Sequence, residues 1–411
     1  MKPLPGQRLN NRIIVVGGSI GGLFAANLLH RSGWDVHVFE RASEDLQGRG
    51  AGIVTHPELI DALAQAGITV TENFGVKVQT RVTVGRDGSI VGSRDAPQVL
   101  TAWNRVYRLL RGAFPNERYH NNKHLTEFAQ DESGVQVEFA DGEVVQADVL
   151  IGADGLRSPI RQAILPEVVP KYAGYVAWRG MVEEAALSER VLTDIFPYFA
   201  FDLPPKEQML AYPIAGLKNS NKPGRRRYNF VWYRPVDERE LLNMMRDDHG
   251  KVWPEGIPPP LIRPAVIKAA RQAAFDVLSP QFAEVVDKTE SLFFQPIFDL
   301  ESHQIAFDRI AILGDAAFVA RPHCAMGVTK AGGDAIALTN ALNNHKNIEK
   351  ALLVFEKERM KVGGAIVDHA RALGAYMQAQ ISTPAQRKRA EMYRTPEAVM
   401  RETAYPPAAH L

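Results

Sequence analysis

The stretch "RIIVVGGSIGGLFAANLLHRSGWDVHVFER", residues 12–41, decides the fold. We expect an apolar strand over 12–17, a glycine-dense turn, a helix over 21–32 and a second strand over 35–40. A strand, a tight turn and a helix in this order are typical of a dinucleotide-binding βαβ unit. The turn, however, reads G-G-S-I-G-G, so that Ser19 stands where the fingerprint G-x-G-x-x-G has its middle glycine.

The residues of this turn suit a pyrophosphate. Gly17 permits the tight turn, and Gly22 permits close packing of the helix on the strand. Ser19 is small, and its hydroxyl can donate to a phosphate oxygen beside the helix N-terminus, whose free N–H groups favour an anion. Glu40 ends the second strand and can accept hydrogen bonds from both hydroxyls of a ribose. The turn alone does not separate NAD from FAD, and the alternative interpretation is a glycine-rich turn without a ligand.

Two later stretches also end an apolar strand in a glycine and an aspartate. The first, "DVLIGADGLRSPIRQ" at 148–162, turns at Asp154, and its alternative interpretation is a plain strand–turn–helix. The second, "RIAILGDAAFVARPHCAMGVTKAGGDA" at 309–335, turns at Asp315, which can bind a hydroxyl of ribitol or ribose. A long helix then begins near Gly327, and its N-terminus can face a ring carbonyl that gains negative charge on reduction.

The composition excludes several classes of function. The 411 residues include 48 Lys and Arg against 47 Asp and Glu, so no overall field favours nucleic acid or an anionic membrane. The one cysteine, Cys324, excludes an intramolecular disulfide and a cysteine-built zinc site. No stretch approaches the roughly 20 apolar residues that a membrane span needs. We therefore expect a soluble, cytoplasmic protein that binds neither nucleic acid nor membrane and has no metal site.

The nucleotide-binding signals are interrupted by a different kind of sequence. Aromatic residues and prolines dominate from Tyr172 to Pro296, in short apolar runs that predict an antiparallel sheet. We predict an α/β fold, α+β overall, in which a Rossmann-like nucleotide-binding domain is interleaved with a mostly antiparallel domain and followed by a helical C-terminal region. The predicted divisions are 10–75, 100–170 and 300–365 for the nucleotide-binding domain, 76–99 and 171–299 for the antiparallel domain, and 366–411 for the C-terminal helix and tail.

Five stretches carry a resemblance to a known family: "GGSIGGL", "VFER", "GAGIV", "YAGYVAWRG" and "GDAAFVARPHCAMGVTKA". Over residues 11–365 or so the chain resembles the single-component FAD-dependent aromatic hydroxylases of the para-hydroxybenzoate hydroxylase fold group. Within that group it is most similar to the 2,6-dihydroxypyridine 3-hydroxylase-like enzymes of pyridine breakdown. The resemblance implies that the nucleotide-binding domain is an FAD-binding domain and that the antiparallel domain is a substrate domain. It also implies FAD contacts from these residues: Gly17, Ser19, Ile20, Gly22, Glu40, Arg41, Arg49, Gly50, Asp154, Asp315, Pro322, Gly327 and Val328.

The chain also departs from the family pattern. The motif usually written GDAAH reads GDAAF here, with Phe318 in the histidine position and His323 later in the loop. On the helix after the first hairpin, Tyr107 stands where family members usually have an arginine.

The resemblance implies a reaction as well. NADH or NADPH reduces FAD, O₂ adds at flavin C4a, and the hydroperoxide transfers its distal oxygen to an electron-rich ring. Such a site must exclude water and must take a proton from a ring hydroxyl. We predict three candidate proton acceptors, His56, Tyr212 and His323. Aromatic residues of the insert are expected to wall a flat, dry slot, or else to form ordinary sheet core: Trp178, Tyr198, Phe199, Phe201, Tyr212, Trp232 and Tyr233.

The sequence analysis therefore predicts a monooxygenase that hydroxylates a small N-heteroaromatic ring of the hydroxypyridine type. The alternatives are a hydroxylase of phenolic or other aromatic acids, an FAD-dependent oxidase of amines or amino acids, and a non-catalytic flavoprotein. A homodimer is expected from the family, and the choice between NADH and NADPH stays open.

Overall fold

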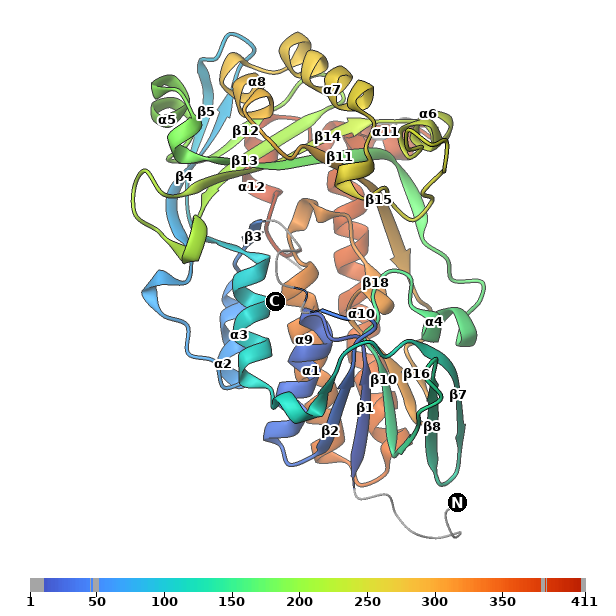
Figure 1. The fold of residues 1–411 in the computed structure, drawn as a ribbon. Helices are drawn as coiled ribbons and strands as arrows, with labels where there is room; N and C mark the ends of the chain where they lie inside the picture. Colours follow the sequence, from blue (N-terminus) through green and yellow to red (C-terminus); the bar gives the residue numbers. More distant parts are fainter. Residues whose placement is uncertain (1–10, 45, 47–51, 378–380, 382, 408–411) are drawn as a thin grey trace.

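Two β-sheets at opposite ends of the molecule organise the fold (Figure 1). The computed structural model describes residues 11–44, 46, 52–377, 381 and 383–407. Within these ranges, no helix is both long enough and apolar enough to cross a membrane.

The first sheet has six strands in the order β16-β17-β10-β1-β2-β6, which are parallel except for the β16–β17 pair. Three of its central strands, β17, β10 and β1, are short apolar runs buried on both faces, as a covered parallel sheet requires. Helices α1 (Ile20–Arg31) and α9 (Gly327–Asn344) pack against each other beside it. The strand bounds are β1 Arg12–Val16, β2 Asp35–Phe39, β6 Tyr119–His120, β10 Val149–Gly152, β16 Ala306–Phe307 and β17 Ile310–Ile312. A three-stranded meander, β7 Leu125–Asp131, β8 Gly134–Phe139 and β9 Val144–Ala147, packs against β1 and β10.

The second sheet has nine strands in the order β18-β15-β11-β14-β13-β12-β4-β5-β3, and only β12 and β4 pair in parallel. Four helices cover one face of it, at the top of Figure 1. The strand bounds are β3 Gly52–Val54, β4 Val76–Val84, β5 Ile90–Ala102, β11 Lys171–Glu183, β12 Phe199–Asp202, β13 Gln208–Ile214, β14 Arg227–Pro235, β15 Phe293–Glu301 and β18 Phe318–Val319. The covering helices are α5 Glu189–Asp194, α6 Glu238–Met244, α7 Pro264–Val277 and α8 Pro280–Asp287.

The two faces of this sheet have different partners because side chains alternate along a strand. Trp178 and Trp232 belong to the core that the covering helices complete. Tyr175 and Tyr233 point to the other face, which packs against Val54 and parts of the C-terminal segment. We call this second side the inner face.

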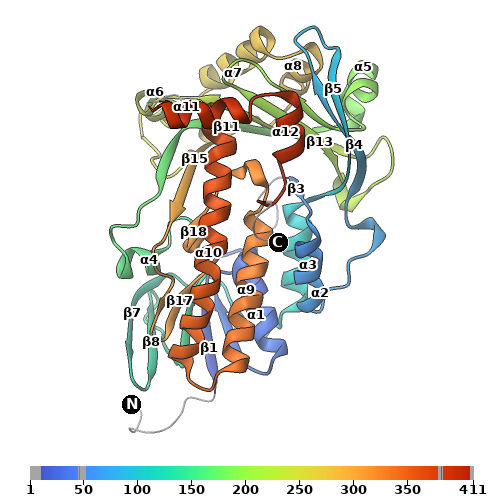
Figure 2. The same cartoon turned by 180° about the vertical axis from the view of Figure 1, so that it is seen from behind.

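The C-terminal part of the chain joins the two sheets. Helix α10 (Ile348–Gly374) runs from beside the first sheet up to the second, as Figure 2 shows. After α11 (Pro384–Met392), helix α12 (Pro396–Glu402) and the next residues lie along β4 and β5. We call residues 395–405 the C-terminal strap.

The division into domains stays a proposal, and three of its predicted boundaries need to move. The boundaries at 99–100, 299–300 and 365–366 fall inside β5, β15 and α10, because each of these elements continues past the predicted limit.

Candidate active site

The glycine-rich turn packs as the sequence analysis expected. Gly17 has a φ of 106°, and a Cβ there would lie 2.3 Å from the carbonyl oxygen of Ala153 at the end of β10. A Cβ on Gly22 would lie 1.9 Å from the carbonyl oxygen of Gly17. Both positions therefore exclude any side chain, because two strand ends and the first turn of α1 meet there.

Ser19 is the N-cap residue of α1, and its hydroxyl makes no capping hydrogen bond. The amide groups of the first helical turn therefore lack a side-chain acceptor, which suits an anionic ligand. Glu40 orders the opposite side of the turn, because its carboxylate accepts hydrogen bonds from the N–H groups of Gly18 at 2.7 Å and Ala42 at 2.9 Å.

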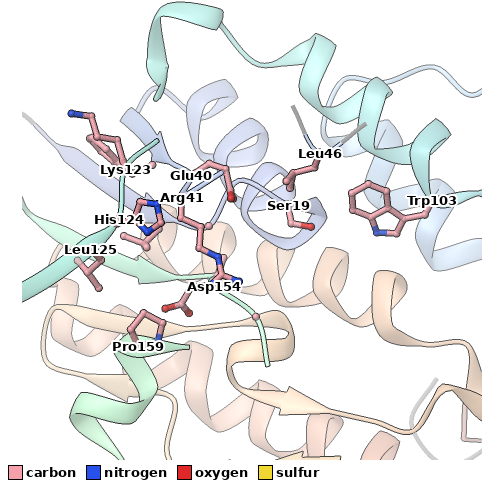
Figure 3. Close-up of a pocket in the computed structure, with 15 residues that line it drawn as sticks. Ser19, Glu40, Arg41, Leu46, Trp103, Lys123, His124, Leu125, Asp154 and Pro159 are labelled. Carbon is pink, nitrogen blue, oxygen red and sulfur yellow. The ribbon is translucent and has the colours of Figure 1, made fainter. Parts of the chain in front are cut away.

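A cavity of about 300 Å³ opens beside this turn, where β1, β2 and β10 end (Figure 3). Its lining includes Ser19, Glu40, Arg41 and Asp154. The carboxyl ends of neighbouring parallel strands are where this type of sheet binds ligands. Trp103 from α3 (Trp103–Ala113) lies at the edge of the cavity and stacks on Tyr107 with ring centroids 5.1 Å apart.

Asp154 has an unused hydrogen-bond acceptor in this cavity. Its Oδ2 accepts from the N–H of Ile160 in α4 (Pro159–Ile164) at 3.3 Å, whereas Oδ1 is buried with no partner among the described residues. Burial raises the pKa of Asp154 to about 6. Three features of this site fit the dinucleotide part of FAD. Asp154 has a buried oxygen without a donor, α1 has no side-chain cap, and Gly17 and Gly22 pack closely against neighbouring backbone. Arg49 and Gly50, which were also predicted to contact FAD, lie outside the described residues.

The second glycine–aspartate turn is held by a buried charge cluster that the sequence analysis missed. Lys330 Nζ donates to the carbonyl oxygen of Gly314 at 2.7 Å and to Asp334 Oδ2 at 3.2 Å. Arg359 Nε donates to Asp334 Oδ1 at 2.7 Å. Burial alone raises the pKa of Asp334, but the charges of Lys330 and Arg359 hold the pKa below its ordinary value. Asp315, in the 3₁₀ turn η6 (Gly314–Ala316), has an exposed side chain with no hydrogen bond to the described residues, so it is available to a ligand.

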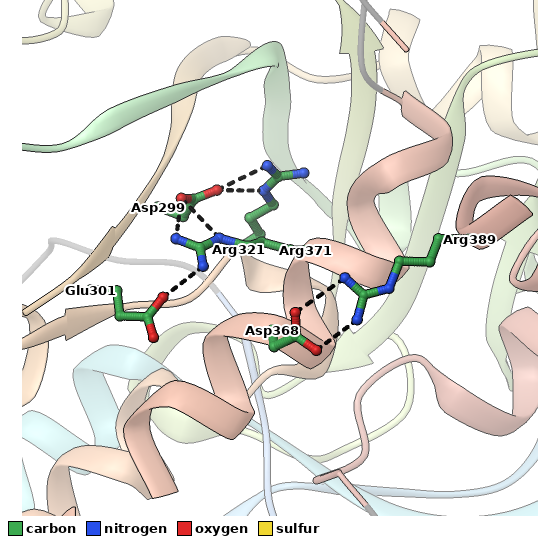
Figure 4. A network of polar contacts seen from close by, with 6 residues as sticks. All are labelled: Asp299, Glu301, Arg321, Asp368, Arg371 and Arg389. Carbon is green, nitrogen blue, oxygen red and sulfur yellow. Dashed lines mark hydrogen bonds and ion pairs between the residues drawn. The ribbon is translucent and has the colours of Figure 1, made fainter. Parts of the chain in front are cut away.

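An ion-pair network fixes the loop that leads into α9 (Figure 4). Arg321 precedes the 3₁₀ turn η7 (Pro322–Cys324) and donates to Asp299 Oδ2 on β15 from Nε at 2.9 Å. Arg371 of α10 donates to the other oxygen, Asp299 Oδ1, at 2.9 Å from Nη2. These contacts fix Arg321, and with it the start of η7 at Pro322, against β15 of the second sheet. Val328, at the start of α9, packs instead against the core of the first sheet.

His323 projects from η7 toward the inner face. Its Nε2 lies 2.7 Å from the hydroxyl of Tyr175, and its ring centroid lies 4.3 Å from that of Tyr233. Its Nδ1 is buried and has no partner among the described residues. Burial, with the charges of Arg321 and Arg179, lowers the pKa of His323 to about 3, so this imidazole is neutral near pH 7.

His56 has both ring nitrogens occupied, which argues against the predicted role of proton acceptor. Nε2 lies 3.2 Å from the carbonyl oxygen of Ala404, and Nδ1 lies 3.0 Å from Thr329 Oγ1. Because a carbonyl only accepts, Nε2 carries the proton and Nδ1 accepts from the threonine hydroxyl. The structure thus places His56 as a link between α2 (Pro57–Gln65), α9 and the C-terminal strap.

Tyr212 is buried on the inner face of the second sheet. Its ring packs on Phe199 with centroids 5.0 Å apart, and burial raises the pKa of its hydroxyl. A Cβ on Gly52 would lie 2.7 Å from that hydroxyl, so the start of β3 passes directly over it.

Three of the predicted slot aromatics are on the other face of the sheet. Trp178, Tyr198 and Trp232 pack with the covering helices, and Trp232 Nε1 donates to Glu207 there at 2.8 Å. The correction follows from the two-residue period of a strand, since neighbours in sequence face opposite sides. The inner face instead carries Phe199, Phe201, Tyr212 and Tyr233 from the predicted group, together with Tyr175.

Arg179 and Asn229 are inner-face polar residues that the sequence analysis missed. Arg179 Nε and Asn229 Nδ2 are buried and have no partner among the described residues. The available signal was the alternation within "YAGYVAWRG", which places Tyr175 and Arg179 on one face and Trp178 on the other.

Comparison with known proteins agrees with this arrangement. A model described as an NAD(P)-binding Rossmann-like domain matches residues 15–73, and one described as FAD binding domain-like matches residues 172–299. The chain is 32% identical to 2,6-dihydroxypyridine 3-monooxygenase of Paenarthrobacter nicotinovorans over 90% of this chain and 92% of that protein. It is 28% identical to 6-hydroxynicotinate 3-monooxygenase of Bordetella bronchiseptica over 80% and 82%.

Solved structures have the same fold. That of 2,6-dihydroxypyridine-3-hydroxylase from Arthrobacter nicotinovorans superposes with a TM-score of 0.85 at 32% identity, covering 92% of this chain and 95% of that one. That of Klebsiella pneumoniae HpxO complexed with FAD and uric acid has a TM-score of 0.76 at 21% identity, covering 97% and 94%, and supports the fold alone.

The fold and the cavity define a flavoprotein oxidoreductase in which a Rossmann-like unit is interleaved with a large, mostly antiparallel sheet. More narrowly, the chain belongs to the family of FAD-dependent aromatic and heteroaromatic monooxygenases. This confirms the resemblance, the fold class and the enzyme class predicted from the sequence. FAD, a nicotinamide nucleotide and O₂ are the cofactor and co-substrates of this class.

Proposed function

We propose that the protein uses FAD and NAD(P)H to hydroxylate a small, electron-rich N-heteroaromatic ring of the hydroxypyridine type. The observation that carries the proposal is the inner face, where Tyr175, Arg179, Tyr212 and Asn229 gather next to the η7 loop. The similarity to an enzyme named for a dihydroxypyridine, over 90% of the chain, supports the same class of ring.

The proposed site residues divide into those that would hold the cofactor and those that would face the ring. Gly17, Ser19 and Glu40 would hold the dinucleotide, and Asp315 with the N-terminus of α9 would hold the flavin end. The chemistry that bound FAD would supply is the oxidation of NAD(P)H and the reduction of O₂, with one oxygen atom going to the ring and the other to water.

The inner face would exclude water and provide a route for the ring proton. Phe199 and Tyr212 form a dry aromatic wall. His323 is neutral, so with its proton on Nε2 it would accept a proton at Nδ1 while Nε2 passes one to the hydroxyl of Tyr175, which would release its own proton toward solvent in the same step. His323 would thus pass the proton on while it stays uncharged itself.

The test is a purified-protein spectrum for bound flavin, followed by NADH and NADPH oxidation with a panel of hydroxypyridines, hydroxynicotinates and hydroxybenzoates. We expect a hydroxypyridine to stimulate oxidation most, with matching O₂ uptake and a product heavier by one oxygen. A protein that cannot be reconstituted with FAD would contradict the proposal, and a response to benzoates alone would replace the ring class. The homodimer and the cytoplasmic location are retained as proposals from the sequence.

A further inference from the structure

Arg179 is at the centre of the inner face by strand register. It pairs directly with Val231 on β14, which in turn pairs with Leu210 on β13, so the three side chains form one row. The neighbouring rows contain Tyr233 on one side and Asn229 opposite Tyr212 on the other. Side chains in adjacent rows of a sheet are within reach of a long residue such as arginine.

This guanidinium has no counter-charge among the residues that the structure describes. It is half-buried, and it forms no hydrogen bond or ion pair with any residue that the structure describes. Carboxylates on neighbouring strands are already used. Asp299 binds Arg321, and Glu207 binds Trp232 on the helix-covered face. A charge left without a partner in such surroundings is costly unless a ligand completes the site.

Other polar groups of the inner face also lack hydrogen-bond partners among the described residues. The amide nitrogens of Asn229 and Gln208 are buried donors without acceptors in the described part of the chain. Burial raises the pKa of the Tyr212 and Tyr233 hydroxyls, and the charge of Arg179 partly opposes this. These groups therefore donate hydrogen bonds near pH 7, and the site as a whole requires acceptors.

The geometry points to Arg179 as the group that binds the aromatic substrate as an anion, with a deprotonated ring oxygen against the guanidinium. The inference rests on the proposed function and adds to it the charge of the bound substrate. On binding, the O–H bond of the ring hydroxyl breaks heterolytically, the electron pair stays on oxygen, and the proton leaves to solvent. No electron is transferred in this step. An oxyanion beside a guanidinium is stabilised, so the bound ring ionises at a lower pH than the free ring.

The test is an anaerobic titration of the oxidised, FAD-loaded protein with 2,6-dihydroxypyridine, without NAD(P)H, over a range of pH. The ultraviolet difference spectrum reports whether the bound ring is neutral or ionised. For the unmodified protein we expect the anion spectrum at least one pH unit below the pKa of the free ligand. Arg179→Met should bind at least tenfold more weakly and give the neutral spectrum at that pH, and Arg179→Lys should recover part of both.

The control is Arg239→Met on α6, an exposed arginine on the helix-covered side that should leave affinity and spectrum unchanged. If Arg179→Met does not fold, as judged by flavin absorbance and unfolding midpoint, Arg179→Gln replaces it. An Arg179 variant that binds the ring as tightly, with the same ionisation, overturns the inference and leaves the proposed function intact. An FAD-loaded protein that binds neither the dihydroxypyridine nor 6-hydroxynicotinate overturns both.

Discussion

Ser19 occupies a fingerprint position where glycine is usual, and its backbone explains why serine is tolerated. Its φ of −83° and ψ of −170° are ordinary extended values, so the position requires a small residue but not glycine. Gly17, with a φ of 106°, does require glycine. The departure from the fingerprint therefore leaves the geometry of the turn intact and adds one hydroxyl group to it.

Gly17→Ala should destabilise the fold and weaken FAD binding, because the new Cβ meets the carbonyl of Ala153 at 2.3 Å as well as an unfavourable φ. Gly33→Ala is the matched control, since Gly33 has a φ of 93° but nothing within 4 Å of its Cβ. Backbone strain alone costs about 1–3 kcal/mol, so we expect the Gly17 variant to lose more unfolding free energy than the control. Urea denaturation and FAD fluorescence titration measure the two effects. Equal losses in both variants would contradict the prediction.

His323 should make the fold less stable in mild acid. The imidazole is protonated near pH 6.5 in the unfolded chain, but burial lowers its pKa in the folded protein to about 3. The unfolded state thus binds more protons between these values, and the unfolding free energy falls as pH falls, by about 1.4 kcal/mol per pH unit at most. His323→Gln should flatten this slope between pH 6 and 4 in urea denaturation, whereas His303→Gln, an exposed histidine, should not. The same slope in all three proteins would exclude the effect.

Among the elements, the C-terminal strap is attached to the second sheet through one buried arginine. Arg81 on β4 is fully buried, and its Nη1 donates to the carbonyl oxygens of Met400 at 2.7 Å and Thr403 at 2.6 Å. Its guanidinium also lies over the rings of Phe199 and Tyr405. From there the strap reaches Ala404, whose N–H donates to the carbonyl oxygen of His323 at 2.7 Å. One arginine therefore connects the chain end to the inner face.

Arg81→Met should release the strap and loosen the η7 loop. Two hydrogen bonds from a charged donor are lost, each worth about 1.5–3 kcal/mol, so residues 395–405 should exchange their amide hydrogens faster. Hydrogen-exchange mass spectrometry of the FAD-loaded protein measures this, peptide by peptide. Arg94→Met on β5 is the control, because Arg94 is the exposed cross-strand neighbour of Arg81. Unchanged exchange in the strap of the Arg81 variant would show that other contacts hold it.

In the molecule as a whole, the two sheets are joined by elements that contact both of them. Helix α10 packs against β15 of one sheet and β16 of the other, and the turn after β17 of the first sheet leads directly to β18 of the second. A ligand between the sheets should therefore stabilise them together.

FAD should raise the unfolding midpoint of the whole chain in one transition. A ligand that binds only the folded state adds about 2.7 kcal/mol at a concentration of one hundred times its Kd. Fluorescence of Trp34, near the first sheet, and of Trp232, in the second, should shift together when single-tryptophan variants are heated with and without FAD. A shift of one signal alone would indicate two independently unfolding units.

Local chemistry made several features predictable from the sequence alone. The glycine turn, the apolar strands of the first sheet and the hairpins depend on residues within a few positions of one another. Glu40 and Asp154 could be proposed as cofactor contacts because each directly follows a recognisable strand, and both line the cavity beside the glycine turn. The same local patterns carried the resemblance to the monooxygenase family.

Other features were decided only by the tertiary structure. Whether Trp178 or Arg179 is on the inner face depends on which face of the sheet the covering helices bury, and the composition of the strand does not determine this. The contact of His56 with Ala404 joins residues 348 positions apart, and that of Arg81 with Thr403 joins residues 322 apart. By itself the sequence determined the glycine turn and the strand–turn–helix unit around it, because these are built from short-range contacts. Only the packing of distant segments decided the inner face, because buried polar groups must find their partners in space rather than along the chain.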